Sequence, residues 1–163
     1  MNTISCIVVD DEPLAVRLME SYVAKTPLLS LKGSFTSGTA AYSFLQDNPV
    51  DLLFCDIQMP NLSGMDLSRM LPERTRIIFT TAFSEYAVEG FKVRALDYLL
   101  KPISYDDFLS AAVKAKEYFE VTEPVEVTEQ RKIKSIFVKT EYRLQQIDLD
   151  KITYIEGLKG YVK

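Results

Sequence analysis

Three short apolar runs in this 163-residue chain end at charged residues, and this pattern restricts the possible folds more than any other feature. Continuous apolar runs are typical of strands that are buried on both faces of a parallel sheet. The charged residues that follow the runs at 7–9, 52–55 and 99–100 are Asp10, Asp11, Asp56 and Lys101. Because the carboxyl ends of parallel strands meet at one edge of an open α/β sheet, we expect these four side chains to share one crevice.

Strand-like and helix-like segments alternate from residue 4 to about residue 120. This alternation predicts an α/β fold with a five-stranded parallel, doubly wound sheet of the flavodoxin-like class. The expected strands are 4–9, 29–35, 51–55, 76–81 and 96–100. Helices are expected to begin near Pro13, Gly38, Met65, Glu85 and Ser104, with the last one running to about Phe119.

The chain changes character after residue 121. Residues 122–134 contain a proline, many charges and few large apolar side chains, which indicates a linker after a first domain at 1–121. From residue 135 onward apolar residues such as Ile136 and Val138 recur at alternate positions, which predicts short strands, including one at 152–155. About 30 residues of short strands are too few to bury a stable core. We therefore interpret 135–163 as the incomplete amino-terminal part of a second, all-β domain.

Composition excludes several classes of function. Hydrophobic residues make up 47% of the chain and charged residues 26%, and the net charge of −4 argues against a protein that coats nucleic acid or a membrane surface. The absence of histidine excludes a Ser-His-Asp triad and His-ligated zinc. No apolar run approaches the roughly 18 residues of a membrane helix, and no signal peptide is evident. We expect a cytoplasmic protein in which Cys6 and Cys55 are buried thiols rather than a disulfide.

The acidic residues at the strand ends predict metal-assisted phosphoryl chemistry. In one crevice Asp10, Asp11 and Asp56 would repel one another, so without a cation one carboxyl should have a raised pKa. A hard divalent ion relieves that repulsion, and Mg²⁺ suits one or two carboxylates together with waters and a phosphoryl oxygen. A metal-bound, partly exposed aspartate can attack phosphorus and form an acyl phosphate.

A transferred phosphoryl group carries charge on three oxygens, and each of them needs a partner. Mg²⁺ would take one oxygen and Lys101 a second, while Thr81 at the end of the fourth strand is the best placed hydroxyl for the third. Pro102 allows a cis bond that would aim the lysine. Alone, each residue has an ordinary interpretation, such as a helix cap for Asp10 and a turn residue for Asp56. Their co-occurrence at four strand ends favours the functional interpretation.

The residues around these positions closely resemble the receiver domains of bacterial response regulators. The resemblance covers residues 4 to about 120 and rests on Val-Val-Asp-Asp-Glu-Pro at 8–13, Phe-Cys-Asp-Ile-Gln-Met-Pro-Asn-Leu-Ser-Gly at 54–64, Thr-Ala at 81–82 and Asp-Tyr-Leu-Leu-Lys-Pro at 97–102. It implies that Asp56 accepts a phosphoryl group from a sensor histidine kinase. It also implies that Asp11, Asp56 and the backbone carbonyl of Gln58 bind Mg²⁺ directly, with Asp10 acting through water.

The same resemblance implies a switch rather than an enzyme. Lys101 would pair with the phosphoryl group, Thr81 would move to bond it, and Tyr98 would turn inward as the threonine moves. The resemblance implies no activity beyond Mg²⁺-dependent self-phosphorylation from a phosphodonor and slow self-dephosphorylation. The switch would promote homodimerisation through the face formed by the fourth helix, the fifth strand and the fifth helix. Charged residues expected on that face are Glu89, Lys92, Arg94, Asp97 and Lys114.

Further segments resemble the LytTR subgroup of response regulators. They are Thr-Ala-Phe-Ser-Glu-Tyr-Ala at 81–87 with Phe91 and 95–98, and, in the tail, 135–139, 150–157 and 160–162. The tail segments are similar to the opening strands of a LytTR DNA-binding domain, which implies an output in transcription regulation. Because that domain is longer than 135–163, we expect this chain by itself to bind DNA poorly or not at all.

Other interpretations of the sequence stay open. One is a receiver that acts through protein–protein interaction only, with the tail as a dimer module or a generic β module. Another is an aspartyl-phosphate hydrolase of the haloacid-dehalogenase type, which is disfavoured because Gln58 stands where that group has a second acid. Nucleotide binding is unsupported, since neither GxxxxGK[ST] nor GxGxxG occurs.

Overall fold

The computed structural model describes residues 2–83 and 95–122, together with the strand backbone at 135–139, 144–148, 157–158 and 161–162. The chain divides into two compact units, Met1–Glu123 and Pro124–Lys163. The predicted helix at 85–93 lies outside the described residues. No helix in the described part of the chain combines the length and the apolar character that crossing a bilayer requires.

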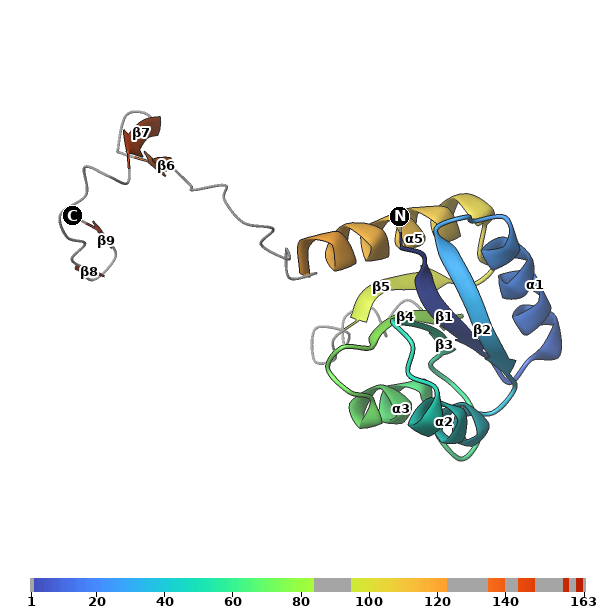
Figure 1. Ribbon diagram of the computed structural model, residues 1–163. Helices are drawn as coiled ribbons and strands as arrows, with labels where there is room; N and C mark the ends of the chain where they lie inside the picture. The colour runs from blue at the N-terminus through green and yellow to red at the C-terminus, as the bar shows by residue number, and fades with distance from the viewer. Residues whose placement is uncertain are drawn as a thin grey trace. The chain divides into compact units, whose positions relative to one another are not determined.

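Five parallel strands form the sheet of the first unit (Figure 1). They are β1 (Ile4–Val9), β2 (Leu29–Phe35), β3 (Leu52–Asp56), β4 (Arg76–Thr81) and β5 (Ala95–Leu100). Their order is β2-β1-β3-β4-β5, which confirms the predicted doubly wound, flavodoxin-like fold. The bounds of β3 and β5 differ by one residue from the prediction. Asp56 is itself the last residue of β3, because it still pairs with Thr80 of β4.

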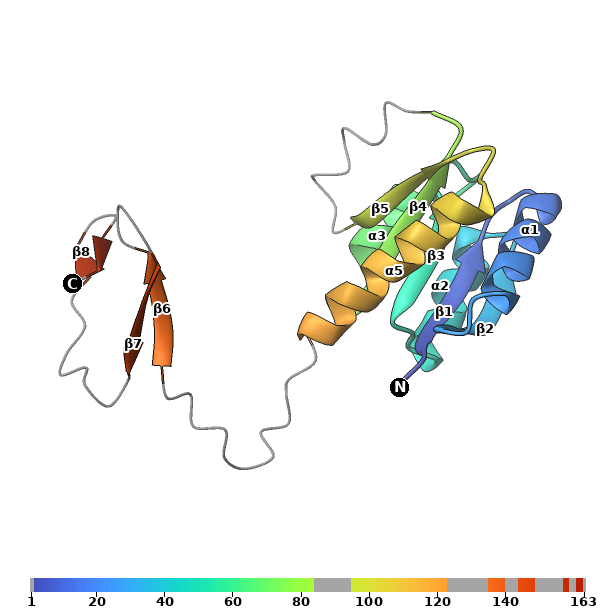
Figure 2. The same cartoon turned by 90° about the horizontal axis from the view of Figure 1, so that it is seen from above.

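Helices cover both faces of this sheet. They are α1 (Pro13–Ala24), α2 (Gly38–Asp47), α3 (Gly64–Met70) and α5 (Tyr105–Thr122). Helices α1 and α5 lie on one face, and α2 and α3 lie on the other (Figures 1 and 2). Hydroxyl groups cap three of the helices, since Ser37, Ser63 and Ser104 each accept a bond from the backbone N–H three residues further on. Helix α5 extends through Thr122, so the first residue of the predicted linker belongs to the helix.

The sheet is buried on both sides by two apolar clusters. Along β1, Cys6 and Val8 belong to the cluster that includes residues of α1 and α5, while Ile7 and Val9 belong to the cluster that includes residues of α2 and α3. Successive residues of a strand point to opposite faces, so a strand covered on both sides must be apolar at every position. This burial explains the uninterrupted apolar runs at 7–9 in β1 and at 52–55 in β3.

The two cysteines are free, as predicted from the sequence. Cys6 lies in the apolar cluster with α1 and α5, and Cys55 lies in the cluster on the other side of the sheet, so their side chains point to opposite faces. Burial raises the pKa of Cys6 to about 12 and that of Cys55 well above its usual value. Both groups are therefore neutral, structural thiols at physiological pH.

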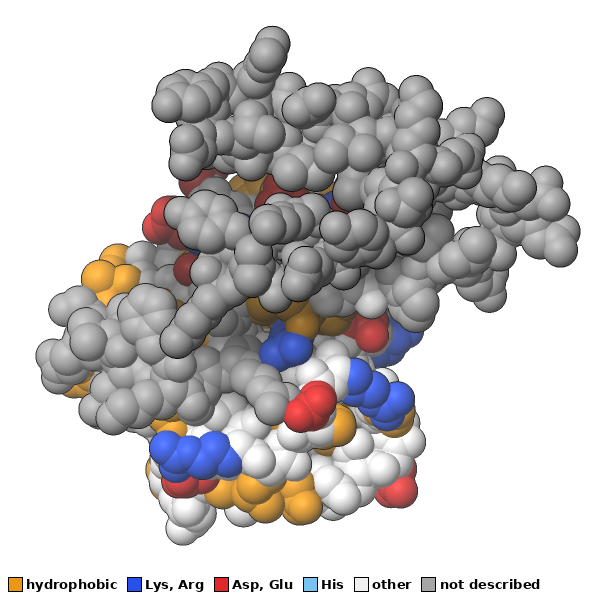
Figure 3. Space-filling view, turned by 90° about the vertical axis from the view of Figure 1, so that its left-hand side faces the viewer, with side chains coloured by type: hydrophobic (Ala, Val, Ile, Leu, Met, Phe, Trp, Pro, Cys, Tyr) orange, Lys and Arg blue, Asp and Glu red, His pale blue; other side chains and the backbone are white. Residues whose placement is uncertain are grey.

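The surface of the first unit carries charges of both signs. Basic, acidic and apolar side chains are mixed on the described part of the face in Figure 3. Lys114 of α5 forms an exposed ion pair with Asp97 of β5 at 2.9 Å, and Arg69 pairs with Asp66 within α3 at 3.2 Å. Exposed pairs of this kind add little to the free energy of unfolding, on the order of 0–1 kcal/mol.

The described strands of the second unit form short antiparallel pairs. Strand β6 (Ser135–Lys139) pairs with β7 (Leu144–Asp148), and β8 (Gly157–Leu158) pairs with β9 (Tyr161–Val162). The first pair agrees with the strand-like alternation predicted around Ile136 and Val138. The predicted strand at 152–155 lies outside the described residues.

Candidate functional site

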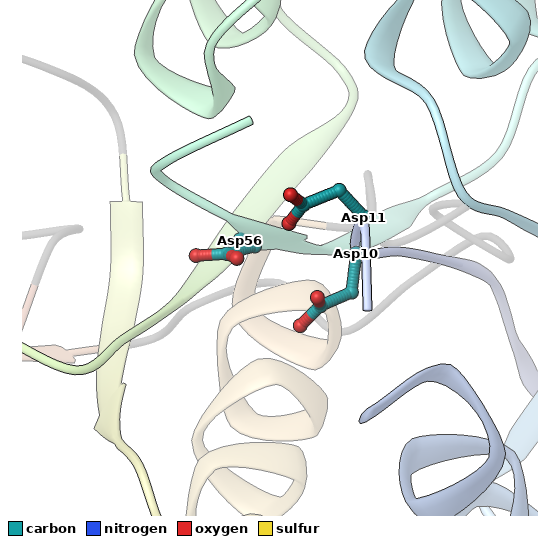
Figure 4. Close-up of side chains that lie close together, drawn as sticks. All are labelled: Asp10, Asp11 and Asp56. Carbon is teal, nitrogen blue, oxygen red and sulfur yellow. The ribbon is translucent and has the colours of Figure 1, made fainter. Parts of the chain in front are cut away.

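The structure brings three carboxylates together at the carboxyl ends of two neighbouring strands (Figure 4). Asp10 and Asp11 directly follow β1, and Asp56 ends β3. One carboxylate oxygen of each residue lies within 4.8 Å of the others. Only 2% of Asp10 and 5% of Asp56 is exposed, while Asp11 is half-buried. Residues that are 46 positions apart in the chain thus form one acidic cluster.

Local backbone geometry fixes two of these carboxylates. The N–H of Glu12 donates to Oδ1 of Asp10 at 2.9 Å, and the N–H of Gln58 donates to Oδ1 of Asp56 at 3.3 Å. Each acid therefore bonds the backbone two residues further on, which is the usual behaviour of Asp where a strand ends in a turn. The helix-cap interpretation of Asp10 is not confirmed, because Glu12 is the N-cap of α1 and no side chain caps that helix; Asp10 instead accepts the Glu12 N–H in the turn before it. The second oxygen of each acid is directed to a cation.

That cation is Lys101, which follows β5. Its Nζ lies 2.9 Å from Oδ2 of Asp10 and 3.3 Å from Oδ2 of Asp56, and its side chain is 20% exposed. The backbone N–H of Lys101 donates to the Thr81 carbonyl at 2.8 Å, which anchors the residue beside β4. The peptide bond between Lys101 and Pro102 is cis, as the sequence suggested. The ammonium group therefore bridges the ends of β1 and β3.

Electrostatics at the cluster act most strongly on Asp56. The pKa of Asp56 is raised from 3.8 to about 6, chiefly by burial and then by the neighbouring Asp10, while Lys101 and the Gln58 N–H oppose the shift. Burial also disfavours the charge of Lys101, but its bonds with Asp10 and Asp56 outweigh that effect and raise its pKa. One ammonium group thus neutralises only part of the charge of three carboxylates. The remaining negative charge favours a bound cation.

The donor set fits a hard divalent ion. Carboxylate oxygens that converge within 4.8 Å suit Mg²⁺, which prefers oxygen ligands and keeps several waters when protein ligands are few. The described residues offer no histidine or nearby thiolate that would favour a softer metal, because Cys55 points into the apolar cluster below α2 and α3. Of the predicted Mg²⁺ ligands, Asp10, Asp11 and Asp56 thus lie close enough together to hold a metal ion.

Binding of Mg²⁺ should depend on pH with a break near pH 6. A carboxyl whose pKa is about 6 is protonated below that pH, so a proton competes with the metal for Asp56. We expect the dissociation constant for Mg²⁺ to change little between pH 8 and 7 and to rise by up to about tenfold for each pH unit below 6. Calorimetric titration from pH 5 to 8 measures this. An Asp56→Asn variant, as control, should bind weakly without the break, and a flat wild-type profile would contradict the prediction.

Thr81 and Tyr98 belong to the neighbouring strands β4 and β5. The Thr81 side chain is 2% exposed, and its Oγ1 accepts a bond from the Phe83 N–H at 3.0 Å. The ring of Tyr98 is half-buried and packs on Phe79 with 5.4 Å between ring centroids. In this structure the Thr81 hydroxyl thus accepts a bond within its own turn. The predicted movement of these two residues involves the segment that follows Thr81, most of which lies outside the described residues.

Sequence reasoning missed the role of Gly64, the first residue of α3. Its N–H donates to the Ile57 carbonyl at 2.8 Å, which closes the loop that follows Asp56. A Cβ at this position would collide with the backbone carbonyl of Asp56. The residue must therefore be glycine for the loop to pack against the end of β3. The Ser63-Gly64 pair before a helix was visible in the sequence, but the close approach depends on tertiary structure.

Comparisons with known proteins agree with this geometry. The family model for the response regulator receiver domain matches residues 6–113, more than half of the chain. The crystal structure of the response regulatory domain of protein mrkE from Klebsiella pneumoniae is similar, with a TM-score of 0.68 and 33% identity over 73% of this chain and 100% of that one. The chain therefore belongs to the response regulator receiver domain family.

Two curated relatives show how far the similarity extends. An uncharacterized response regulatory protein from Shewanella oneidensis is 32% identical over 154 residues, which are 93% of this chain and 65% of that protein. The transcriptional regulatory protein BtsR of Escherichia coli is 40% identical over 102 residues, which are 61% of this chain and 43% of BtsR. The chain thus spans about half to two thirds of the length of these relatives.

Proposed function

We propose that Asp56 accepts a phosphoryl group from the phosphohistidine of a sensor kinase and that the chain is the receiver of a two-component regulator. The observation that carries this proposal is the contact of one ammonium group, that of Lys101, with both Asp10 and Asp56. In the transfer, an Asp56 carboxylate oxygen forms a bond to phosphorus while the bond from phosphorus to the histidine nitrogen breaks. The kinase regains its imidazole, and Asp56 becomes an acyl phosphate.

The residues around Asp56 have separate tasks in this proposal. Asp11, Asp56 and the Gln58 carbonyl hold Mg²⁺, and Asp10 supports it through water. When bound, Mg²⁺ neutralises charge on the phosphoryl oxygens. Lys101 stands 3.3 Å from the accepting carboxylate, so it is placed to hold a second phosphoryl oxygen. The chain itself would be no enzyme beyond self-phosphorylation and slow self-dephosphorylation.

The response to phosphorylation would pass through Thr81 and Tyr98. A phosphoryl group adds about −1.5 to −2 charges at Asp56. We propose that the Thr81 hydroxyl exchanges its bond with the Phe83 N–H for one with a phosphoryl oxygen and that Tyr98 turns inward. The face that includes Asp97 and Lys114 would then pair with a second copy. In the present structure those two residues bond each other at 2.9 Å, so pairing across a dimer would have to compete with this contact.

We further propose that the complete protein regulates transcription through a LytTR DNA-binding domain, of which 135–163 is the beginning, and that it works in the cytoplasm. Supporting this output are the LytTR-like segments of the tail and the antiparallel pair of β6 and β7. The Shewanella relative aligns over most of the tail, and BtsR is named a transcriptional regulatory protein.

Incubation with acetyl phosphate and Mg²⁺ tests the central proposal. We expect the intact mass to increase by one phosphoryl group, the product to be cleaved by hydroxylamine as an acyl phosphate, and the incorporation to stop in EDTA. Incorporation that resists hydroxylamine or persists in EDTA would contradict a Mg²⁺-dependent aspartyl phosphate. Sedimentation of the same samples with beryllofluoride tests dimerisation. A mass that stays monomeric would remove the dimer from the proposal and leave the phosphoacceptor in place.

A further inference from the structure

We propose that Tyr22 is a positioning residue for Lys101. Its hydroxyl holds the Ile103 carbonyl and thereby fixes the short segment that presents the Lys101 ammonium to Asp10 and Asp56. This inference rests on the proposed function, in which Lys101 assists phosphoryl transfer to Asp56. Tyr22 itself touches neither the carboxylates nor the lysine side chain among the contacts of the described residues, so it acts through the backbone.

The contact that carries the proposal joins α1 to the segment after β5. The Tyr22 hydroxyl donates to the carbonyl oxygen of Ile103 at 2.8 Å, across 81 positions of sequence. Ile103 is 7% exposed and lies two residues after Lys101. A hydrogen bond of this length in a partly buried setting is well formed, and leaving a buried carbonyl without it is costly.

Aromatic packing fixes the direction of the Tyr22 ring. Its centroid lies 5.4 Å from that of Tyr105 and 5.4 Å from that of Phe108, and Phe108 is fully buried. A ring held on two sides in this way keeps its hydroxyl aimed at one partner. The hydrogen bond therefore acts as a fixed anchor for Ile103 rather than as one of several alternatives for a mobile side chain.

The segment that carries Lys101 is short and has few other anchors. The Lys101 N–H bonds the Thr81 carbonyl, and Ser104 opens α5 by accepting bonds from the N–H groups of Asp107 and Phe108. The first anchor ties the segment to β4, and the second lies within α5. The bond from Tyr22 is the one described hydrogen bond that ties this segment to α1.

Helix α1 therefore determines both sides of the ion pairs. It begins at Pro13, two residues after Asp11, and its third turn carries Tyr22. The same rigid helix thus fixes the acids at its start and the loop of Lys101 near its end. The distances of 2.9 Å from the Lys101 ammonium group to Asp10 and of 3.3 Å to Asp56 therefore depend on the position of α1. A displacement of about 1 Å at a reacting group can lower a rate by up to 100-fold, so even a small relaxation of the loop matters.

Tyr105 offers a matched control in the same aromatic cluster. Its hydroxyl donates to the Lys25 carbonyl at 3.2 Å and lies 3.2 Å from Oγ1 of Thr26, so it reaches the end of α1 rather than the segment 101–103. Tyr105→Phe and Tyr22→Phe both remove one hydroxyl and keep the aromatic ring. Any effect that comes only from a loosened contact between α1 and α5 should therefore appear in both variants.

The test is a double-mutant cycle on the rate of phosphorylation from acetyl phosphate at saturating Mg²⁺. We expect Tyr22→Phe to slow the rate by about 5- to 10-fold, which corresponds to the loss of one buried hydrogen bond. Tyr105→Phe should change the rate by less than about twofold. In a Lys101→Met background, Tyr22→Phe should have no further effect, because the group that it positions is gone. The Mg²⁺ dissociation constant of Tyr22→Phe should not rise above that of the wild type, because the three carboxylates are kept.

The possible failures are distinguishable. An unchanged rate in Tyr22→Phe, or an equal loss in the Lys101→Met background, would overturn the positioning role alone. An equal loss of rate in Tyr105→Phe would also overturn the positioning role, because it would indicate a general loosening of the aromatic cluster. If Lys101→Met is phosphorylated as fast as the wild type, the proposed role of Lys101 fails and this inference fails with it. Thermal unfolding of each variant verifies that the measured rates come from folded protein.

Discussion

Replacing Asp56 by Asn is expected to abolish phosphoryl incorporation from acetyl phosphate. The amide lacks the anionic oxygen that attacks phosphorus, and no other described carboxylate in the cluster combines the Gln58 N–H bond with the Lys101 contact. We expect less than about 1% of the wild-type rate, in line with the loss of a covalent nucleophile. Quantitative intact-mass spectrometry over time measures the rate of incorporation. The hydroxylamine-sensitive product should be absent in Asp56→Asn.

Asp51→Asn is a suitable control for this experiment. Asp51 immediately precedes the same strand at its opposite end, where its carboxylate accepts bonds from the N–H and the hydroxyl of Ser5. An asparagine there keeps an oxygen for these bonds, so the fold and the phosphorylation rate should be close to those of the wild type. If Asp56→Asn were labelled at the wild-type rate, another residue would be the acceptor and the central proposal would be wrong.

Loss of labelling in Asp56→Asn should not come from unfolding. Because the pKa of Asp56 is about 6 in the folded chain and 3.8 otherwise, the native state binds the extra proton between these pH values, and the free energy of unfolding decreases as the pH rises through them. At pH 7 without metal, the charged carboxylate therefore destabilises the fold. Removing it should raise the free energy of unfolding by about 1–2 kcal/mol, and this gain should vanish below about pH 4.

Much of the fold was predictable because its strands are buried on both faces. Burial of that kind favours continuous apolar runs, as at 7–9 in β1 and 52–55 in β3, so strand type and approximate bounds follow from sequence. Parallel order then places the residues that follow the strands at one edge, which predicted that Asp10, Asp56 and Lys101 would meet. The exact ends of the strands were harder to predict from the sequence. Asp56, for example, belongs to β3 because it pairs with Thr80 of β4.

Features that depend on distant contacts could not be predicted in this way. No local pattern relates Tyr22 to Ile103, because the bond between them depends on how α1 packs beside α5. The need for glycine at position 64 likewise arises from the approach of α3 to the end of β3. The sequence predicted which charged groups meet at the site, while the positions of the supporting residues depend on the packing of the two helical layers.

Replacing Lys101 by Met is expected to lower the rate of phosphoryl transfer and to raise the affinity for Mg²⁺. The apolar stem and its packing are kept, but the ammonium group that contacts Asp10 and Asp56 is lost. Transfer should slow by about 100-fold, as for the loss of one charged group that stabilises a transition state. At the same time the uncompensated carboxylates should attract Mg²⁺ more strongly, so its dissociation constant at pH 8 should decrease.

Lys114→Met separates this effect from a simple change of net charge. This substitution also removes an ion pair, that of 2.9 Å between Lys114 and Asp97. The Lys114 side chain, however, is 58% exposed, and Asp97 lies outside the acidic cluster. Neither the phosphorylation rate nor the Mg²⁺ affinity should change by more than about twofold, because exposed pairs contribute little. Slower transfer together with weaker Mg²⁺ binding in Lys101→Met would indicate a collapsed site. Slower transfer with tighter binding would show that the metal site is intact and that the ammonium group acts on the transfer step. Because Lys101 also lowers the pKa of Asp56, a loss of rate that persists at pH 8 supports an action on the phosphoryl group itself.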